Sequence, residues 1–170
     1  YSGYSWNDKI TVIDNRFISE RVNQIRNWNM TFIQGDILDK DLINKYCKDA
    51  DVIHHLAGIT DVPRVKSEST FEKEELIRKV AEEGTQNILD AISDECKIIM
   101  PSSHVVYEGL DSVKKNIKED EKTCPTLAYG KSKNINEKQL KNSRKNFVIL
   151  RLASVYGYST DTARIDIMAN

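Results

Sequence analysis

Short apolar runs alternate with longer amphipathic stretches along the chain. Five of these runs are continuously apolar or rich in β-branched residues, and they predict strands at residues 9–14, 30–34, 51–58, 97–103 and 147–153. Runs of this kind fit strands that are buried in a sheet covered on both faces.

Between the predicted strands, apolar residues recur at helical spacing. This pattern predicts helices over roughly 39–48 and within 70–93, and a third helix that starts near Leu127. Gly84 lies inside the apolar stripe of the second helix, which predicts close approach of that helix to the sheet. Regular alternation of strands and helices predicts an α/β fold with a doubly wound, Rossmann-like parallel sheet and right-handed crossovers.

Composition narrows the class of protein. The 170 residues suit one domain, and 39% hydrophobic with 30% charged residues is typical of a globular protein. A formal net charge of −1 without a basic patch argues against nucleic-acid binding. No run is long enough to cross a membrane, and no signal peptide is recognisable. The polar stretch 111–122 is interpreted as a solvated surface loop.

Cysteine usage indicates the compartment. Cys47, Cys96 and Cys124 are an odd number at wide spacings, so we expect buried or semi-buried thiols in a reducing compartment, by default the cytoplasm. No metal site is expected either. His54 and His55 are adjacent in a predicted strand and therefore point to opposite faces, which favours a structural role.

Asp14 ends the first predicted strand and is the first candidate for ligand binding. Ligands of doubly wound folds lie at the carboxyl ends of the strands, and an acidic residue there can accept hydrogen bonds from an adenosine ribose. Such a carboxylate favours NAD over NADP, whereas Arg16 argues the other way. The alternative is an ordinary turn residue. The glycine-rich loop that normally precedes this strand is missing, because only eight residues come before Lys9.

Ser103, Tyr129 and Lys133 form the second candidate site. Residues four apart lie on one helix face, so Tyr129 and Lys133 can point into the same cleft. An ammonium lowers the pKa of a nearby phenol, which suits it to proton exchange with a substrate hydroxyl. Ser103, at the end of a predicted strand, could hold the substrate oxygen. The Tyr-x-x-x-Lys spacing also occurs by chance in lysine-rich proteins, but the order of these features along the chain favours a site.

These motifs resemble a known family. The stretches are "ITVIDN" (10–15), "GDILD" (35–39), "VIHHLAG" (52–58), "GTQNILDA" (84–91), "PSSHVVYEG" (101–109), "YGKSK" (129–133) and "LRLASVYG" (150–157). Together and in this order they resemble the extended short-chain dehydrogenases/reductases, the NAD-dependent epimerase/dehydratase family, and within it the nucleotide-sugar 4-epimerases.

The resemblance implies roles for individual residues. Ser103, Tyr129 and Lys133 would be catalytic, with Tyr129 as the acid/base, and the substrate would contact Ser103, His104 and Ser154. The cofactor NAD would be bound by Asp14, Asn15, Asp36, Ile37, Leu56, Ala57, Gly58, Ser102, Tyr129 and Lys133.

The chain also departs from the family pattern. Residues 1–170 resemble a partial dinucleotide-binding domain that lacks the first strand, the glycine loop, the first helix and the C-terminal substrate domain. Dehydratases of the family carry an Asp-Glu pair where this chain has His104 and Val105, which favours epimerisation or simple oxidoreduction. Ser154 and Ala81 stand where relatives have asparagines, at the substrate diphosphate and near the cofactor.

Taken together, the sequence predicts an NAD-dependent epimerase or oxidoreductase, most readily a nucleotide-sugar 4-epimerase. One alternative is an NAD(P)-dependent reductase of a non-sugar carbonyl. Another is a non-catalytic binding scaffold, if the chain is complete as it stands. By analogy with relatives, a homodimer through the long helix and the Tyr-Lys helix is expected.

Overall fold

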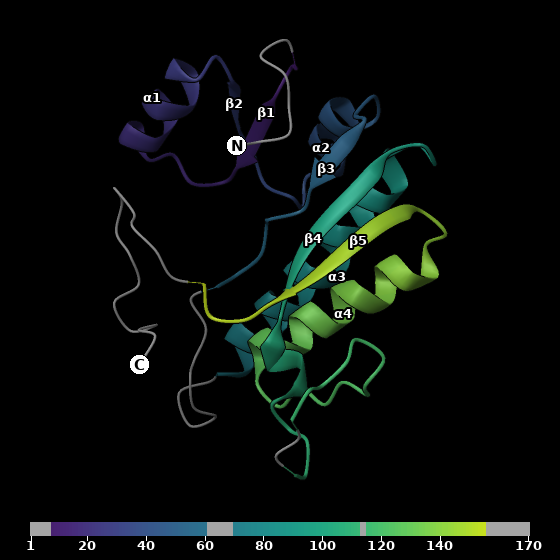
Figure 1. Ribbon diagram of the computed structural model, residues 1–170. Helices are drawn as coiled ribbons and strands as arrows, with labels where there is room; N and C mark the ends of the chain where they lie inside the picture. Colours follow the sequence, from purple (N-terminus) through teal and green to yellow (C-terminus); the bar gives the residue numbers. More distant parts are fainter. Residues whose placement is uncertain (1–7, 61–69, 113–114, 156–170) are drawn as a thin grey trace.

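Two parallel sheets form the centre of the computed structural model (Figure 1), which describes residues 8–60, 70–112 and 115–155. One sheet pairs β1 (Thr11–Asp14) with β2 (Thr31–Gln34). The other has the order β3-β4-β5, formed by Val52–His54, Lys97–Ser103 and Asn146–Leu152. The last two residues of the "LRLASVYG" motif, Tyr156 and Gly157, lie outside the described part of the chain.

This arrangement fits the predicted doubly wound parallel fold. In the order 3-2-1-4-5-6, the first strand lies between the second and the fourth. The sheet β1-β2 fits positions 2 and 3, and the sheet β3-β4-β5 fits positions 4 to 6. Among the described residues, no strand occupies the central position between these two sheets.

The three predicted helices are confirmed as α2 (Lys40–Cys47), α3 (Phe71–Ala91) and α4 (Ala128–Asn142). Side-chain caps start two of them: the Asp39 carboxylate accepts the Leu42 N–H at 3.0 Å, and the Thr70 hydroxyl accepts the Lys73 N–H at 3.3 Å. Each cap satisfies a backbone donor that the first helical turn leaves without a partner.

One helix was not predicted. Helix α1 (Ser19–Asn27) follows β1 and carries only two aliphatic residues, Val22 and Ile25, and only Val22 is buried. Its apolar stripe is therefore too sparse to stand out as a periodic pattern. A short 3-10 helix, η2 (His104–Tyr107), likewise follows β4 without a distinct sequence signal.

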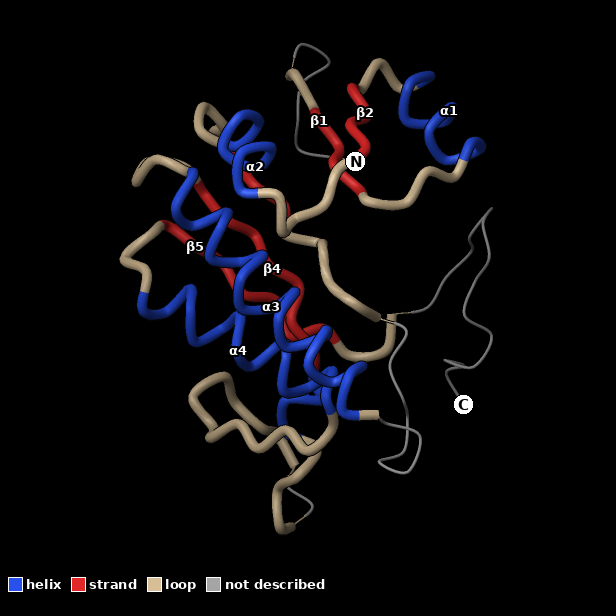
Figure 2. The backbone as a smooth tube through the Cα atoms, turned by 180° about the vertical axis from the view of Figure 1, so that it is seen from behind, coloured by secondary structure: helices blue, strands red, loops and turns tan. Residues whose placement is uncertain are grey.

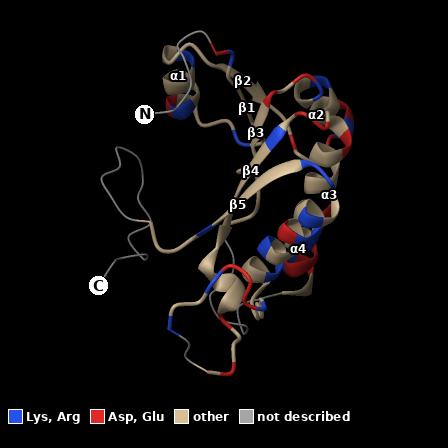
Figure 3. Cartoon of the chain, turned by 45° about the vertical axis from the view of Figure 1, so that its right-hand side comes forward, with Lys and Arg blue, Asp and Glu red and all other residues tan. Residues whose placement is uncertain are grey.

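Helices α2, α3 and α4 lie along one face of the strand layer, as Figures 2 and 3 show from two further directions. The core on this side includes Ile98 and Met100 of β4 and Leu140 of α4, each at most 1% exposed. The predicted covering of both faces is found at the β1-β2 sheet, where α1 packs against β2 on the face opposite α2. Over the β3-β4-β5 sheet, the face opposite α3 and α4 carries no helix in the described part of the chain, and Leu150 and Leu152 of β5 remain 42% and 40% exposed.

Strand β3 is shorter than the predicted run 51–58, and Pro101 of β4 explains why. The His55 N–H donates to the Ile99 carbonyl at 2.9 Å. The next bond of a parallel ladder would need an N–H from residue 101, which proline lacks. The ladder therefore stops at His55. The residues after it leave the sheet, and the Pro101 carbonyl is left for another donor.

Gly84 permits a close approach, as predicted, although its neighbour is a loop residue and not a strand. A Cβ atom at Gly84 would lie 2.8 Å from Cγ2 of Ile37, in the segment between β2 and α2. Cys47 and Cys96 are buried, whereas Cys124 is exposed and corrects the expectation of three sheltered thiols. Among the described residues, no helix is both long and apolar enough to cross a membrane.

Candidate active site

The carboxyl ends of β1 and β2 bring three predicted cofactor-binding residues together. Asp14 is the last residue of β1 and is exposed, and its Oδ1 accepts the Arg16 backbone N–H at 2.8 Å. Asn15 follows it and donates Nδ2 to Asp36 Oδ2 at 3.2 Å. Asp36 also accepts the Leu38 N–H at 2.9 Å. These bonds hold the carboxylates in place at one edge of the sheet.

Ile37, in contrast, is half-buried and packs toward Gly84 of α3. Its carbonyl oxygen accepts a hydrogen bond from the Asn87 side chain at 3.0 Å. The segment after β2 is therefore fastened to α3 from two sides. The predicted contact between Ile37 and the cofactor remains a prediction.

The segment 56–58 forms the second part of the site. Leu56, Ala57 and Gly58 are exposed, because β3 ends before them. A Cβ atom at Gly58 would meet no atom within 4 Å, so the chain is open to solvent at this point. Ala57 and Gly58 line a small cavity of about 10 Å³ together with Tyr129 and Lys133. The structure thus places the segment 57–58, predicted to bind the cofactor, next to the predicted pair Tyr129 and Lys133.

Tyr129 and Lys133 of α4 face this cavity together, as the i, i+4 spacing predicted. The Lys133 Nζ lies 5.7 Å from the centroid of the Tyr129 ring and donates to the Pro101 carbonyl at 3.0 Å. Lys133 is 9% exposed, and its burial lowers the pKa of the amine from its usual value. The charged form is costly in this environment, so the site favours a ligand or phenolate that compensates it.

Glu108 and Gly130 fix where α4 begins. Glu108 Oε1 accepts the Leu127 N–H at 2.8 Å and the Thr126 N–H at 2.9 Å, so a carboxylate from a distant segment caps the helix. A Cβ atom at Gly130 would lie 3.0 Å from Pro125 Cβ and 3.1 Å from the Val105 carbonyl oxygen. The glycine in "YGKSK" therefore lets the first turn of α4 approach η2 closely.

Ser103 ends β4 and starts η2. Its Oγ accepts the Val105 N–H at 3.4 Å, which leaves the hydroxyl proton free to donate to a substrate oxygen. Next to it, His104 Nδ1 lies 3.3 Å from the Leu152 carbonyl oxygen. His104 lines a larger cavity of about 590 Å³, with Tyr107, Lys118 and Arg151 among its other walls. Ser154 follows β5 and is exposed.

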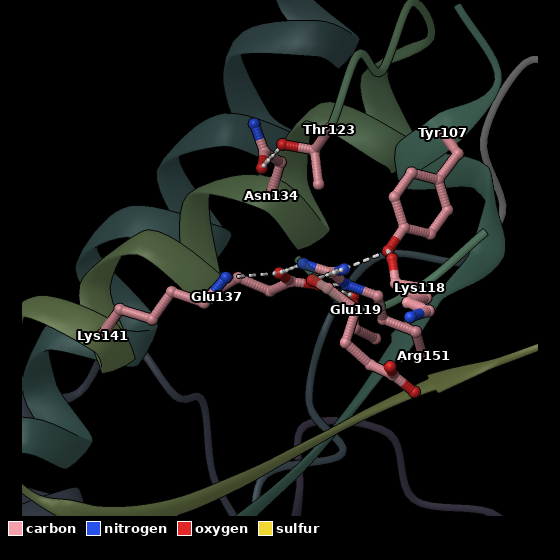
Figure 4. Close-up of polar contacts among 9 residues, drawn as sticks. Tyr107, Lys118, Glu119, Thr123, Asn134, Glu137, Lys141 and Arg151 are labelled. Carbon is pink, nitrogen blue, oxygen red and sulfur yellow. Dashed lines mark hydrogen bonds and ion pairs between the residues drawn. The ribbon is translucent and has the colours of Figure 1, made fainter. Parts of the chain in front are cut away.

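A buried ion pair joins α4 to β5 (Figure 4). Glu137 of α4 and Arg151 of β5 form two hydrogen bonds of 2.9 and 2.6 Å, and their side chains are 1% and 11% exposed. The Ser102 hydroxyl donates to Glu137 Oε1 at 2.7 Å. Ser102 was predicted to lie beside the cofactor. That contact stays untested, but the structure gives its hydroxyl an interior partner.

Arg151 also fastens the polar stretch 115–122. Its Nη1 atom donates to the Glu119 carbonyl at 2.8 Å and to the Tyr107 hydroxyl, which itself donates to the Lys118 carbonyl at 3.1 Å. This stretch was predicted to be a solvated surface loop, and residues 115–120 are exposed and lie outside helices and strands, as predicted. Its backbone is in addition tied to the sheet through Arg151.

The charge of Glu137 is maintained by its partners. Burial alone would raise the pKa of this carboxyl, but hydrogen bonds from Arg151 and Ser102, together with the charges of Arg151 and Lys141, outweigh it, so the pKa is lowered. Both members of the pair are therefore ionised at neutral pH, and α4 is fixed against the ends of β4 and β5.

Sequence reasoning missed Pro101, Glu108, Glu137 and Arg151 as residues that shape the site. Arg151 and Glu137 lie 14 positions apart on different elements, so no local spacing reveals them. Pro101 in the middle of an apolar run was the one available signal, because proline is unusual inside a paired strand. No group of His, Cys, Asp or Glu suited to a metal occurs among the described residues.

Comparison with known proteins identifies the family to which the chain belongs. Residues 5–170 match the model of the NAD dependent epimerase/dehydratase family. The UDP-glucuronic acid 4-epimerase from Bacillus cereus, solved in complex with NAD, is 26% identical with a TM-score of 0.69, over 88% of this chain and 49% of that one.

Two further solved structures are similar. The UDP-N-acetylglucosamine 4-epimerase from Methanobrevibacter ruminantium M1, in complex with UDP-N-acetylmuramic acid, is 27% identical with a TM-score of 0.69, over 84% of this chain and 46% of that one. The UDP-glucose 4-epimerase from Thermotoga maritima is 21% identical with a TM-score of 0.73, over 91% of this chain and 50% of that one, and supports the fold alone. The chain spans about half the length of these structures, and it belongs to the NAD dependent epimerase/dehydratase family.

Proposed function

We propose that this chain is the cofactor-binding and catalytic part of an NAD-dependent nucleotide-sugar 4-epimerase. The observation that carries the proposal is the cavity shared by Tyr129, Lys133 and the exposed segment 57–58. A phenol, an ammonium and an open backbone segment meet there at the carboxyl ends of parallel strands, where doubly wound folds bind ligands. The 4-epimerases among the similar solved structures support the choice of reaction.

The residues present fit NAD. The exposed Asp14 carboxylate keeps acceptor capacity for the hydroxyls of an adenosine ribose, because Arg16 occupies only one of its oxygens. A carboxylate there disfavours the extra phosphate of NADP. Lys133 has donors left for the second ribose, since the Pro101 carbonyl takes only one of its three. Bound NAD would supply reversible hydride acceptance.

The chain's own residues would handle the proton. Tyr129 would accept the proton of the sugar 4-hydroxyl and return it after the keto sugar has turned over. The Lys133 ammonium would stabilise the phenolate form of Tyr129. Ser103, whose proton is free, would hold the substrate oxygen. His104 and Ser154 would contact the substrate, both being exposed near the ends of β4 and β5.

Epimerisation fits better than dehydration. Elimination of water needs a carboxyl pair after the serine, and His104 with Val105 cannot supply it. Reduction of a non-sugar carbonyl remains the second candidate, because Ser154 has a shorter reach than the asparagine that it replaces.

The replacement Tyr129→Phe in the natural full-length protein tests the proposal. We expect turnover of nucleotide sugars to fall by about a thousandfold or more, because the acid/base is lost, while NAD remains bound. Turnover is followed by separating the two sugar epimers, and bound NAD by its absorbance in the purified protein. Unchanged turnover would remove Tyr129 from the mechanism, and a natural protein that binds no NAD would remove the enzyme assignment.

A further inference from the structure

Asn136 lines the same cavity as Tyr129 and Lys133, and the sequence analysis gave it no role. It lies on α4 three positions after Lys133 and is 6% exposed. Residues three apart on a helix are neighbours on one face. A buried carboxamide beside an ammonium and a phenol is a polar group that needs an explanation.

The orientation of this carboxamide follows from its partners. Asn136 Nδ2 donates to the Ala81 carbonyl oxygen at 2.8 Å and to Thr85 Oγ1 at 2.7 Å. A backbone carbonyl can only accept, so the atom facing Ala81 is the nitrogen. Both amide protons are thereby used, and the polar atom that Asn136 has left for the cavity is its oxygen, Oδ1.

A second layer holds the amide in this orientation. Thr85 is 1% exposed, and its Oγ1 lies 2.8 Å from His55 Nε2. Since Thr85 accepts from Asn136, its own proton can go to a neutral His55. Burial, and then the charge of Lys133, lower the pKa of His55 to about 4, so this imidazole is neutral at physiological pH. The hydrogen bonds therefore run from His55, which follows β3, through Thr85 of α3 to Asn136 of α4, and all three side chains are uncharged at physiological pH.

The cavity has complementary hydrogen-bonding groups. Lys133 brings donors and Asn136 brings an acceptor. A group that accepts from one and donates to the other is a hydroxyl. The cavity volume of about 10 Å³ is that of a single water or hydroxyl group. A carboxylate or phosphate oxygen could not donate to Asn136 Oδ1 and would therefore fit less well.

We propose that Asn136 is a further ligand-binding residue of this site, whose Oδ1 accepts a hydrogen bond from a ribose hydroxyl of the bound dinucleotide, and that Thr85 and His55 position it. This inference rests on the proposed function for the identity of the dinucleotide. Recognition of this hydroxyl is a role that a residue serving only to tie α4 to α3 would not have.

Gln139 provides the matched control. It lies on α4 one turn further on, and its Nε2 donates to the Glu82 carbonyl of α3 at 2.8 Å. It makes the same kind of tie between the same two helices but does not line the cavity. Replacement by leucine at either position removes one amide-to-carbonyl bond between α4 and α3, and at Asn136 it also removes the bond to the Thr85 hydroxyl. Only the change at Asn136 also removes an acceptor from the cavity.

The test is NAD titration of the natural full-length protein and its Asn136→Leu and Gln139→Leu variants, by calorimetry. We expect Asn136→Leu to raise the Kd for NAD by about five- to tenfold, which one hydrogen bond supports, and Gln139→Leu to leave it within about twofold. An NAD analogue without a hydroxyl on the nicotinamide ribose should bind more weakly to the unaltered protein, with little further loss in Asn136→Leu.

Two results would overturn the inference. Equal NAD affinity in Asn136→Leu and the unaltered protein would mean that water alone fills the cavity, and equal weakening in both leucine variants would mean a purely structural tie. If Asn136→Leu does not fold, Thr85→Val serves instead, because it removes the positioning hydroxyl in nearly the same volume. This variant is expected to bind NAD more weakly, and an unchanged Kd for NAD would contradict the inference. An unaltered protein that binds no NAD would overturn the proposed function itself.

Discussion

His55 shows how a single residue acquires its role from burial. The sequence predicted only that two adjacent histidines point to opposite faces, and the structure confirms it: His54 is exposed, while His55 is 4% exposed and bonded to Thr85. The prediction of a structural role could not specify the partner, because Thr85 is 30 positions away on another helix. The same holds for Pro101, whose missing N–H acts on a strand far from it in sequence.

The depressed pKa of His55 predicts a stability effect. Its pKa of about 4 lies below the ordinary histidine value of 6.5, so between these values the unfolded chain binds more protons than the folded one, and the free energy of unfolding falls as the pH is lowered. We expect this group to cost roughly 2 kcal/mol between pH 7 and pH 5. Denaturant unfolding should show that His55→Gln loses this part of the pH dependence and that His54→Gln, the exposed control, keeps it. An unaltered slope in His55→Gln would contradict the assignment.

At the scale of elements, periodicity predicted α2, α3 and α4 and all five strands, because each carries an apolar stripe or run. It failed where apolar residues are few, as in α1, and where a partner strand decides the boundary, as at the end of β3. Periodicity could not predict the side-chain contacts that hold the elements together. Glu137 and Arg151 join α4 to β5, and Glu108 joins η2 to the start of α4.

The Glu137–Arg151 pair predicts non-additive mutational effects. Arg151→Met leaves a buried carboxylate without its main partner and is expected to lower the free energy of unfolding by about 3–5 kcal/mol. Adding Glu137→Met removes that uncompensated charge, so the double variant should be more stable than Arg151→Met alone. Denaturant unfolding of the four proteins measures the coupling. Lys40→Met, at an exposed ion pair with Asp90, should cost less than about 1 kcal/mol. Additive losses in the double variant would refute the coupling.

At the scale of the whole molecule, the described strands form two parallel sheets whose carboxyl ends carry the predicted site residues other than Tyr129 and Lys133, which lie on α4. The sequence order of the motifs predicted this convergence, because parallel strands in a doubly wound fold end at the same edge. What it could not predict is which faces are covered. The sheet face formed by Leu150 and Leu152 is open in the described part of the chain, although the apolar runs read as fully buried strands.

The central claim is that the sugar is oxidised and reduced again at one carbon, with Tyr129 moving the proton. The most direct measurement incubates the natural full-length protein with a nucleotide sugar that carries deuterium at C4 and analyses the epimerised product by mass spectrometry. The account predicts that the product retains the deuterium, because a hydride that passes to bound cofactor and back does not exchange with water, and that Tyr129→Phe forms almost no product. Loss of the deuterium to solvent during epimerisation would contradict hydride transfer and with it the proposed mechanism.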